Sequence, residues 1–250
     1  MSLANKRKRP DDLLVEQGLA ADLEHAQALI LSGKVFAQDR RIDKTGTPIS
    51  AQTGLTVRVA KHPWVSRGGL KLDHAFRHFN LDALNAVAID VGASTGGFTD
   101  VLLSRGAARV YTVDVGYGQL HWKLRTDNRV TVLERINARH LTSAHIPEPV
   151  DIVVCDSSFI SISTVLAVPL NFVTNGGHVV ALIKPQFEVA KHEVGKGGVV
   201  LDLKLHLQVC ERIVRWLADV PGWHVLGVEN SPVNGTDGNK EFLIAAQFVA

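Results

Sequence analysis

Hydrophobic residues recur with two different spacings along the chain, and the change falls near residues 61–66. Before this change, apolar residues follow helical and then strand-like spacing, with turn residues between the strands. The predicted elements are two helices at residues 11–19 and 23–35, the second capped at Gly33, and two strands at residues 34–37 and 55–60. The pattern therefore predicts a small α+β domain over residues 1–61.

After residue 86 the pattern becomes strand, turn and helix in alternation. The predicted strands are 86–91, 109–115, 130–136, 150–156, 178–184, 223–229 and 241–250. Helical segments of about ten or more residues are expected between the first five, a long helix at 201–220, and a tight hairpin through the turn-rich segment 231–239. This predicts an α/β, Rossmann-like domain at 86–250, with a mostly parallel seven-stranded sheet and helices on both faces. Residues 62–85 are assigned to a linker and a lead-in helix.

Length and composition are compatible with this division, since 250 residues with 46% hydrophobic content can form one medium-sized core and one small one. The chain shows neither a bilayer-spanning apolar segment nor a signal peptide, so we expect a cytoplasmic protein with no membrane partner. Cys155 and Cys210 lie in apolar runs, where buried reduced thiols are usual. Neither a disulfide nor a bound metal is expected.

The small net charge of +2 conceals an uneven distribution. Residues 1–71 hold 12 Lys and Arg against 7 Asp and Glu, a balance of +5, whereas residues 72–250 hold 15 against 18, a balance of −3. This asymmetry favours an N-terminal part that binds RNA or DNA, and a solvated charged face is the alternative. The candidate RNA-binding residues are Lys6, Arg7, Lys8, Arg9, Lys34, Arg40, Arg41 and Arg67.

A glycine-rich turn follows the first strand of the larger domain, in the sequence DVGASTGGF at residues 90–98. It is not a Walker A loop, because Phe98 stands where that loop requires lysine, and its glycine spacing disfavours a dinucleotide. A turn of this kind together with Asp114 at the end of the next strand is typical of S-adenosylmethionine (SAM) sites, in which the acid binds the ribose hydroxyls. A turn needed only for packing is the alternative. The candidate cofactor-binding residues are Asp90 (near the methionine ammonium), Gly92, Ser94, Thr95, Gly96, Gly97, Phe98, Asp114, Asn137 and Asp156.

Four charged residues next to predicted element ends form a candidate catalytic set: Lys71, Asp156, Lys184 and Glu241. The ends of adjacent parallel strands open onto one cleft, so Asp156 and Lys184 are expected to converge there. Partial burial and a nearby cation such as Lys71 would lower the pKa of Lys184, while the two acids would raise it. Lys184 is the candidate general base and the acids are assigned to orientation and charge balance. Each residue taken alone could equally be a solvated charge at a strand end.

The motifs WVSRGGLKL, DVGASTGGFTDVLL, TVDVGYGQL, DSSFISI, IKPQFEV and GNKEF occur in the order found in the TlyA family, historically called hemolysin A. The chain resembles this family over nearly its whole length. The resemblance implies an S4 RNA-binding domain followed by an FtsJ-like methyltransferase domain, with SAM as cofactor and a cytidine ribose 2′-oxygen of ribosomal RNA or ribosomal subunits as target. It places a Lys-Asp-Lys-Glu tetrad on the four charged residues above. The Ser-Arg pair usual before the second S4 helix is replaced here by Asp22 and Leu23, which removes one expected phosphate contact.

Three other interpretations can be tested against the same sequence. An amino methyltransferase acting on adenine would carry an Asn/Asp-Pro-Pro-Tyr/Phe motif, and residues 156–159 read DSSF. A secreted hemolysin would need an export signal or membrane-spanning segments. An RNA-binding factor with a vestigial SAM site would not need the four charged residues. Phe159 and Phe187 are candidates for stacking on a base, the loop 195–202 is a candidate lid or a plain surface loop, and the oligomeric state stays open.

Overall fold

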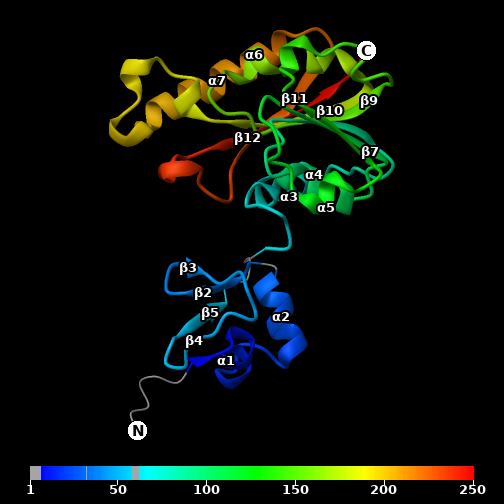
Figure 1. Ribbon diagram of the computed structural model, residues 1–250. Coiled ribbons are helices and arrows are strands. Elements are labelled where there is room, and N and C mark those ends of the chain that lie inside the picture. Colours follow the sequence, from blue (N-terminus) through cyan, green and yellow to red (C-terminus); the bar gives the residue numbers. More distant parts are fainter. Residues whose placement is uncertain (1–6, 32, 58–61) are drawn as a thin grey trace. The chain divides into compact units, whose positions relative to one another are not determined.

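The computed structural model describes residues 7–31, 33–57 and 62–250. The chain forms two compact units, residues 1–63 and 64–250 (Figure 1). The helix α3 (Gly68–His78) packs within the second unit, against α4 (Gly97–Ser104). The second unit therefore begins before residue 86, because the segment that precedes the first strand supplies one of its covering helices.

The first unit is a small α+β structure. Its elements are β1 (Arg7–Lys8), α1 (Pro10–Glu16), α2 (Leu23–Leu31), β2 (Val35–Ala37), β3 (Arg40–Arg41), β4 (Ile49–Ser50) and β5 (Leu55–Val57). Strands β3, β2 and β5 form one antiparallel sheet, and β1 pairs with β4. Its core joins both helices to the three-stranded sheet through Leu13, Leu14, Ala26, Ile30, Val35 and Leu55. Gly33 has a φ of 67° and its N–H donates to Ile30, so it ends the second helix as predicted.

Buried or capping carboxylates hold both helices of the first unit. Asp11 has no exposed surface and accepts hydrogen bonds from Arg9 at 2.6 and 2.9 Å and from Gln27 at 3.0 Å. The bond with Arg9 lowers the pKa of Asp11 to about 2. Asp22 accepts a hydrogen bond from the backbone N–H of His25 at 2.8 Å. The acid that replaces the usual serine at this position therefore caps α2.

The second unit contains a seven-stranded sheet in the order β11-β12-β10-β9-β6-β7-β8. The strands are β6 (Val87–Val91), β7 (Arg109–Asp114), β8 (Val130–Glu134), β9 (Val150–Cys155), β10 (Val173–Ile183), β11 (Trp223–Asn230) and β12 (Phe242–Phe248). All pairs from β8 to β10 are parallel, whereas β12 is antiparallel to both of its neighbours. The order reverses between β6 and β9, which is the point where α/β sheets bind their ligands. The predicted mostly parallel sheet is confirmed.

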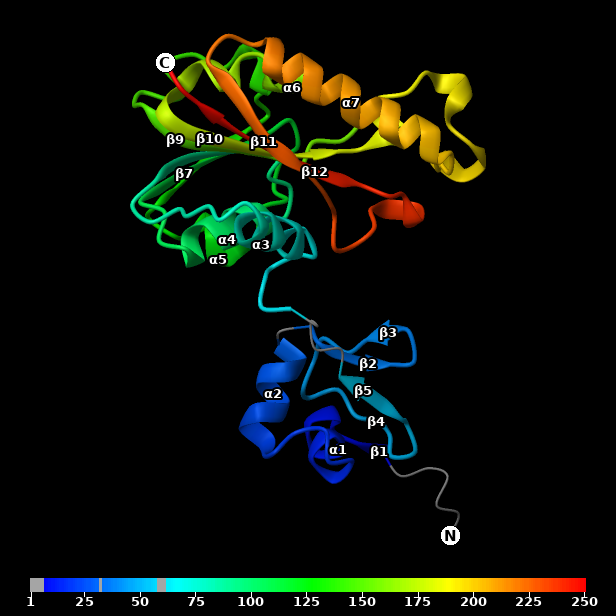
Figure 2. The same ribbon diagram turned by 180° about the vertical axis from the view of Figure 1, so that it is seen from behind.

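Helices cover the two faces of this sheet (Figures 1 and 2). On one face α3, α4 and α5 (Trp122–Arg125) bury Leu72, Phe76, Val101 and Leu124 against the strands. On the other face α6 (Ile162–Leu166) and α7 (Leu203–Asp219) bury Ile162, Val209 and Ile213. Apolar burial of this kind contributes about 25 cal/mol for each Å² removed from water. Cys155 is buried and Cys210 is half-buried, both are free thiols, and burial raises the pKa of each to about 11.

The first unit has five short strands where two were expected, and two details of the second unit also differ from the expectation. The helices between the first five strands are shorter than ten residues: α4 has eight, α5 four and α6 five, and the β8–β9 connection holds only the 3₁₀ turn η2 (Ala138–His140). Pro147 and Pro149 precede β9 and cannot continue a helix. The predicted hairpin forms, but its connection is not tight, since Asn230 pairs with Phe242 and residues 231–241 form a loop. This loop carries Asn239 and Glu241, whose contacts are described below.

The bonds of Asp11 generate a stability prediction for the first unit. Asp11→Asn should lower the free energy of unfolding of this unit by about 1–3 kcal/mol, because the ion pair between buried Asp11 and half-exposed Arg9 is lost. The contribution is present above the ordinary pKa of 3.8 and is lost as pH falls toward about 2, since the folded-state pKa is depressed. Hydrogen exchange of residues 10–31 in the full chain measures this change. The neighbouring Asp12→Asn is the matched control, and equal protection in both variants would contradict the assignment.

Candidate active site

The carboxyl edge of the parallel strands carries the glycine-rich turn. Gly96 has a φ of 95° and precedes α4, a left-handed conformation in which a side chain is strained. A Cβ atom on Gly97 would lie 2.3 Å from Ser66 Oγ and 2.8 Å from the backbone nitrogen of Gly69. Glycine is therefore required at this position because the start of α3 packs directly on the start of α4.

The next strand places an acid beside the same turn. Asp114, the last residue of β7, accepts hydrogen bonds from the backbone N–H groups of Ser94 and Gly116, each at 2.7 Å. Asn137 lies nearby and caps η2 by accepting from the N–H of Arg139 at 3.1 Å. Both side chains line a cavity of about 470 Å³ whose walls include Val115, Ile136 and Val165. Two polar side chains above apolar walls suit the ribose and the base of a nucleoside.

Asp90, at the end of β6, has one carboxylate oxygen that accepts hydrogen bonds and one that has no partner among the described residues. Its Oδ2 atom accepts from the N–H and the hydroxyl of Thr99, at 2.9 and 2.6 Å. Its Oδ1 atom is buried and has no hydrogen-bond partner among the described residues. The side chain faces a second cavity of about 680 Å³, and burial raises the pKa of Asp90 to about 7. A buried acceptor without a partner is costly, so this oxygen suits a ligand ammonium group.

The four candidate catalytic residues converge on this larger cavity, and all four line it. Lys71 Nζ lies 2.5 Å from Glu241 Oε2 and 4.0 Å from Asp156 Oδ2. Lys184 Nζ lies 2.6 Å from the other oxygen of Asp156, Oδ1. Lys71, Lys184 and Glu241 are exposed by only 7%, 7% and 5%. The carboxylate of Asp156 therefore lies between two buried lysines that are 113 residues apart in the sequence (184 − 71).

Lys184 is held by an ion pair and two hydrogen bonds. Besides Asp156 Oδ1, its Nζ donates to Ser158 Oγ at 3.1 Å and to the backbone oxygen of Asp156 at 3.3 Å. β10 ends at Ile183, and Pro185 begins the 3₁₀ turn η4 (Pro185–Phe187) directly after the lysine. The proline cannot continue the strand, because it has no N–H for the ladder. Ser158 was not singled out from the sequence, since a serine in a loop gives no signal without its partner.

The two cavities share Gly92, Ser94, Asp156, Ser158 and Phe159, so they form one cleft. The cleft offers a polar pair for a ribose at Asp114 and Asn137, a free buried carboxylate oxygen at Asp90, and two lysines beyond them. SAM presents a nucleoside, an ammonium group and a sulfonium methyl in one molecule. The described residues fit it in this order. Thr95 lines the cleft, and Phe98, which is 3% exposed, mainly packs in the core between α3 and α4.

The candidate RNA-binding residues divide between the two units. Lys6 lies outside the described residues. Arg7 and Lys8 form β1, with Lys8 ion-paired to Glu16, and Arg9 is engaged by Asp11. Lys34 is half-buried, whereas Arg40 and Arg41 in β3 are exposed, with Arg41 Nε 2.5 Å from Asp43.

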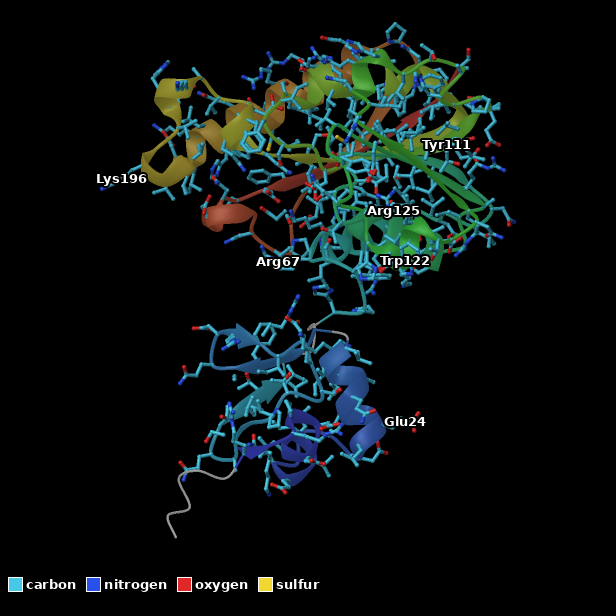
Figure 3. All side chains as sticks on the ribbon, in the orientation of Figure 1. Glu24, Arg67, Tyr111, Trp122, Arg125 and Lys196 are labelled. Carbon is cyan, nitrogen blue, oxygen red and sulfur yellow. The ribbon has the colours of Figure 1, made fainter. Side chains whose placement is uncertain are left out.

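Arg67 differs from the other candidates because it belongs to the second unit. It is exposed, precedes α3 and lines the larger cavity (Figure 3). Arg67 therefore adds an exposed cation to the lining of the larger cavity.

The glycine-rich loop 195–202 is fastened to the loop before β12. Asn239, which is 3% exposed, accepts from the N–H of Val200 at 3.1 Å and donates to the oxygen of Gly198 at 3.0 Å. Figure 3 shows Lys196 at the outer end of this loop, pointing away from the sheet. Closure of the loop as a lid would have to break the Asn239 contacts. Asn239 was not singled out from the sequence, although it lies only two residues before Glu241.

Comparison with known proteins agrees with this geometry. Residues 64–248 match the family model of the FtsJ-like methyltransferase. The chain is 46% identical to the 16S/23S rRNA (cytidine-2′-O)-methyltransferase TlyA of Mycobacterium tuberculosis, over 96% of this chain and 89% of that protein. The chain belongs to the TlyA family of FtsJ-like methyltransferases. It is also 43% identical to a candidate rRNA methyltransferase, YqxC of Bacillus subtilis, over 97% of this chain and 86% of that protein.

A solved structure that covers nearly the whole chain supports the fold. A candidate hemolysin from Streptococcus thermophilus matches with a TM-score of 0.72 at 38% identity, covering 99% of this chain and 90% of that chain. Membership of the TlyA family confirms the expected methyltransferase fold, an enzymatic activity and SAM as cofactor. None of the helices in the described part of the chain has the length and apolar character that crossing a bilayer requires.

The raised pKa of Asp90 predicts a pH-dependent difference in stability. Between about pH 4 and 7 folded Asp90 keeps a proton that the unfolded chain has lost, so its contribution to stability falls as pH rises. Asp90→Asn cannot ionise. The stability of this variant relative to the unmodified protein should therefore rise by up to about 1.4 kcal/mol per pH unit in that window. All four tryptophans lie at or after residue 64, so urea unfolding followed by tryptophan fluorescence reports on this unit.

The matched control is Asp219→Asn, which removes an exposed carboxylate from the end of α7. In this control the difference from the unmodified protein should stay flat across the same pH range. Asp90→Asn should also weaken SAM binding at least about tenfold, because the ammonium loses its anionic partner. A flat profile together with unchanged SAM affinity would refute the role assigned to Asp90.

Proposed function

We propose that this enzyme transfers the methyl group of SAM to a ribose 2′-hydroxyl of ribosomal RNA, at a cytidine. The observation that carries this proposal is the convergence of Lys71, Asp156, Lys184 and Glu241, three of them buried, on the cleft that fits SAM. A ribose hydroxyl is a poor nucleophile and must lose its proton during the reaction. A lysine held at a fixed place in a water-poor site is suited to accept that proton. The TlyA relative of Mycobacterium tuberculosis is named for the same reaction on 16S and 23S rRNA.

SAM supplies an electrophilic methyl group on its sulfonium. Lys184 would accept the proton of the 2′-hydroxyl, and SAM bound in the cleft would supply the methyl group to that oxygen. Asp156 and Ser158 hold the nitrogen of Lys184 in place, and Asp156 then balances the charge of the ammonium that results. Positioning contributes several kcal/mol and general base catalysis about 10²- to 10⁴-fold.

Lys71 and Glu241 have a different role from Lys184. The 2.5 Å contact between them neutralises Lys71, while its ammonium still lies 4.0 Å from Asp156 Oδ2. Asp156 therefore has a lysine on either side, and these contacts fix the position of its carboxylate. We assign Lys71 and Glu241 to positioning Asp156 and the substrate oxygen, and Lys184 to proton removal.

Two aromatic side chains provide a surface for the target base. Phe159 is 90% exposed and has a φ of 65°, an unfavourable conformation that holds the ring at the rim of both cavities. Its ring centre lies 5.0 Å from that of Phe187. An exposed aromatic ring beside a reactive centre suits stacking of an unpaired base, which a 2′-hydroxyl enzyme needs when it takes a nucleotide out of an RNA structure.

The first unit is proposed to be an S4-like domain that holds the RNA backbone. Support comes from its two helices and following sheet, its excess of positive charge, and the exposure of Arg40 and Arg41 on β3. The enzyme would work on ribosomal RNA or ribosomal subunits in the cytoplasm. Because Asp22 caps α2 in place of the usual serine, we assign the phosphate contacts to β3 rather than to the start of α2.

A methylation assay tests the proposed function. Protein incubated with labelled SAM and with separate ribosomal subunits should transfer label to rRNA, and mapping should locate it on a ribose 2′-oxygen. Lys184→Ala should lower the rate at least about 100-fold, because the general base is lost, and should leave SAM affinity within about threefold. Isothermal titration measures the affinity.

The matched control is Lys191→Ala, which removes an exposed lysine seven residues after the proposed base (191 − 184) and should keep the full rate. Absence of label on rRNA in every assembly state, with SAM still bound, would favour a non-catalytic ribosome-binding factor. Transfer to a base instead of a ribose would refute the oxygen target. Undiminished activity of Lys184→Ala would refute that lysine as the base while leaving the reaction itself in place.

The role of the first unit predicts a change in salt dependence. Replacing both arginines of β3, Arg40→Gln and Arg41→Gln, should weaken rRNA binding and reduce the slope of log affinity against log salt by about one to two. Filter binding at several salt concentrations measures the slope. Arg109→Gln with Arg215→Gln is the charge-matched control, with Arg109 at the opposite, amino-terminal edge of the sheet. Identical slopes in the two double variants would place RNA recognition elsewhere.

A further inference from the structure

Two histidines and a glutamate form a cluster outside the catalytic cleft. His74 and His78 lie one turn apart on α3, and Glu229 lies on β11. The Nε2 atom of His74 is 3.9 Å from Glu229 Oε1, and that of His78 is 3.5 Å from Glu229 Oε2. One potential ligand atom from each residue lies within 4.8 Å of the others. We propose that these three side chains form a zinc-binding site that links α3 to β11.

The chemistry of this donor set favours zinc. Two imidazole nitrogens and one carboxylate oxygen are ligands found in zinc proteins with three protein donors, where a water occupies the fourth position. Histidines at i and i+4 on a helix point the same way and can bind one ion. In a tetrahedral site with bonds near 2.1 Å, donor atoms are separated by about 3.4 Å. The separations of 3.5 and 3.9 Å to Glu229 are close to this value.

The surroundings leave these groups available for an ion. The Nε2 atom of His74 is buried and has no hydrogen-bond partner among the described residues. The side chains of His74, His78 and Glu229 are 38%, 43% and 28% exposed, so solvent can reach the cluster. The ring of His78 packs edge-on against Phe79 at 4.7 Å between centres, which restricts its orientation. A partly shielded nitrogen without a partner gains more from a metal bond than a fully hydrated one.

The position of the cluster gives the ion a structural effect. His74 and His78 follow Lys71 by three and seven residues, so all three lie along one face of α3. Glu229 pairs with Leu243 in the hairpin whose loop carries Glu241. Lys71 already joins the same helix to Glu241. A zinc ion would add a second link between α3 and the hairpin, one turn away from the buried ion pair.

Titration of the full-length protein with Zn²⁺, after treatment with a chelator, tests the site directly. One equivalent should bind with a dissociation constant in the micromolar range or tighter. When free Zn²⁺ is about 100 times its dissociation constant, the melting temperature of the second unit should rise by roughly 5 °C. Tryptophan fluorescence measures this change. Mg²⁺ at the same concentration should have no such effect, because it prefers six oxygen ligands.

Three variants and one control complete the test. His74→Gln, His78→Gln and Glu229→Gln should each weaken Zn²⁺ binding at least about 100-fold and abolish the thermal shift. His224→Gln removes an exposed histidine from the same strand as Glu229 and should leave both unchanged. Absence of saturable binding, or binding that persists in all three variants, would overturn the proposal. These measurements do not depend on methyl transfer, so their outcome is independent of the function proposed above.

Discussion

The catalytic cleft depends on the buried ion pair between Lys71 and Glu241, which joins the helix before the first strand of the large sheet to the loop before its last strand. Removing either partner would leave an uncompensated charge in a site that is less than one-tenth exposed. Each residue therefore requires the other. The close packing of Gly69 on Gly97, and the bond at 2.9 Å from the N–H of Val65 to Asp100, hold the start of α3 where this pair can form.

Acidic residues at the carboxyl edge of the sheet line different parts of the cleft. The acids at the ends of β6 and β7, Asp90 and Asp114, face the part of the cleft that fits the cofactor. Asp156, after β9, lines both parts and contacts both lysines. A single carboxylate thus links two lysines from different elements, α3 and the end of β10. Asp156 and Lys184 meet because they follow the neighbouring strands β9 and β10.

Much of this arrangement could be predicted from local pattern. Val/Ile-rich runs identified all seven strands, and residues 90–98 with Asp114 indicated SAM, because strand ends and tight turns have local sequence requirements. The lengths of the connections could not be predicted, since α5 and α6 are stabilised by packing rather than by their own propensity. The contacts of Ser158 and Asn239 depend on partners 26 and 39 residues away. The helical spacing of His74 and His78 is visible in the sequence, but their proximity to Glu229 on β11 could not be predicted from it.

The position of β12 has a consequence for how the enzyme is made. β10 and β11 do not pair with each other, and each pairs with β12, which follows both in the sequence. A chain emerging from the ribosome therefore keeps a gap in its sheet until residues 242–248 are free to enter it. Glu241 immediately precedes this strand, so it is synthesised 170 residues after Lys71 (241 − 71). Lys71 therefore has no Glu241 to pair with during most of synthesis. A growing chain therefore cannot form the buried pair of Lys71 and Glu241 until the segment that leads into the closing strand has been made.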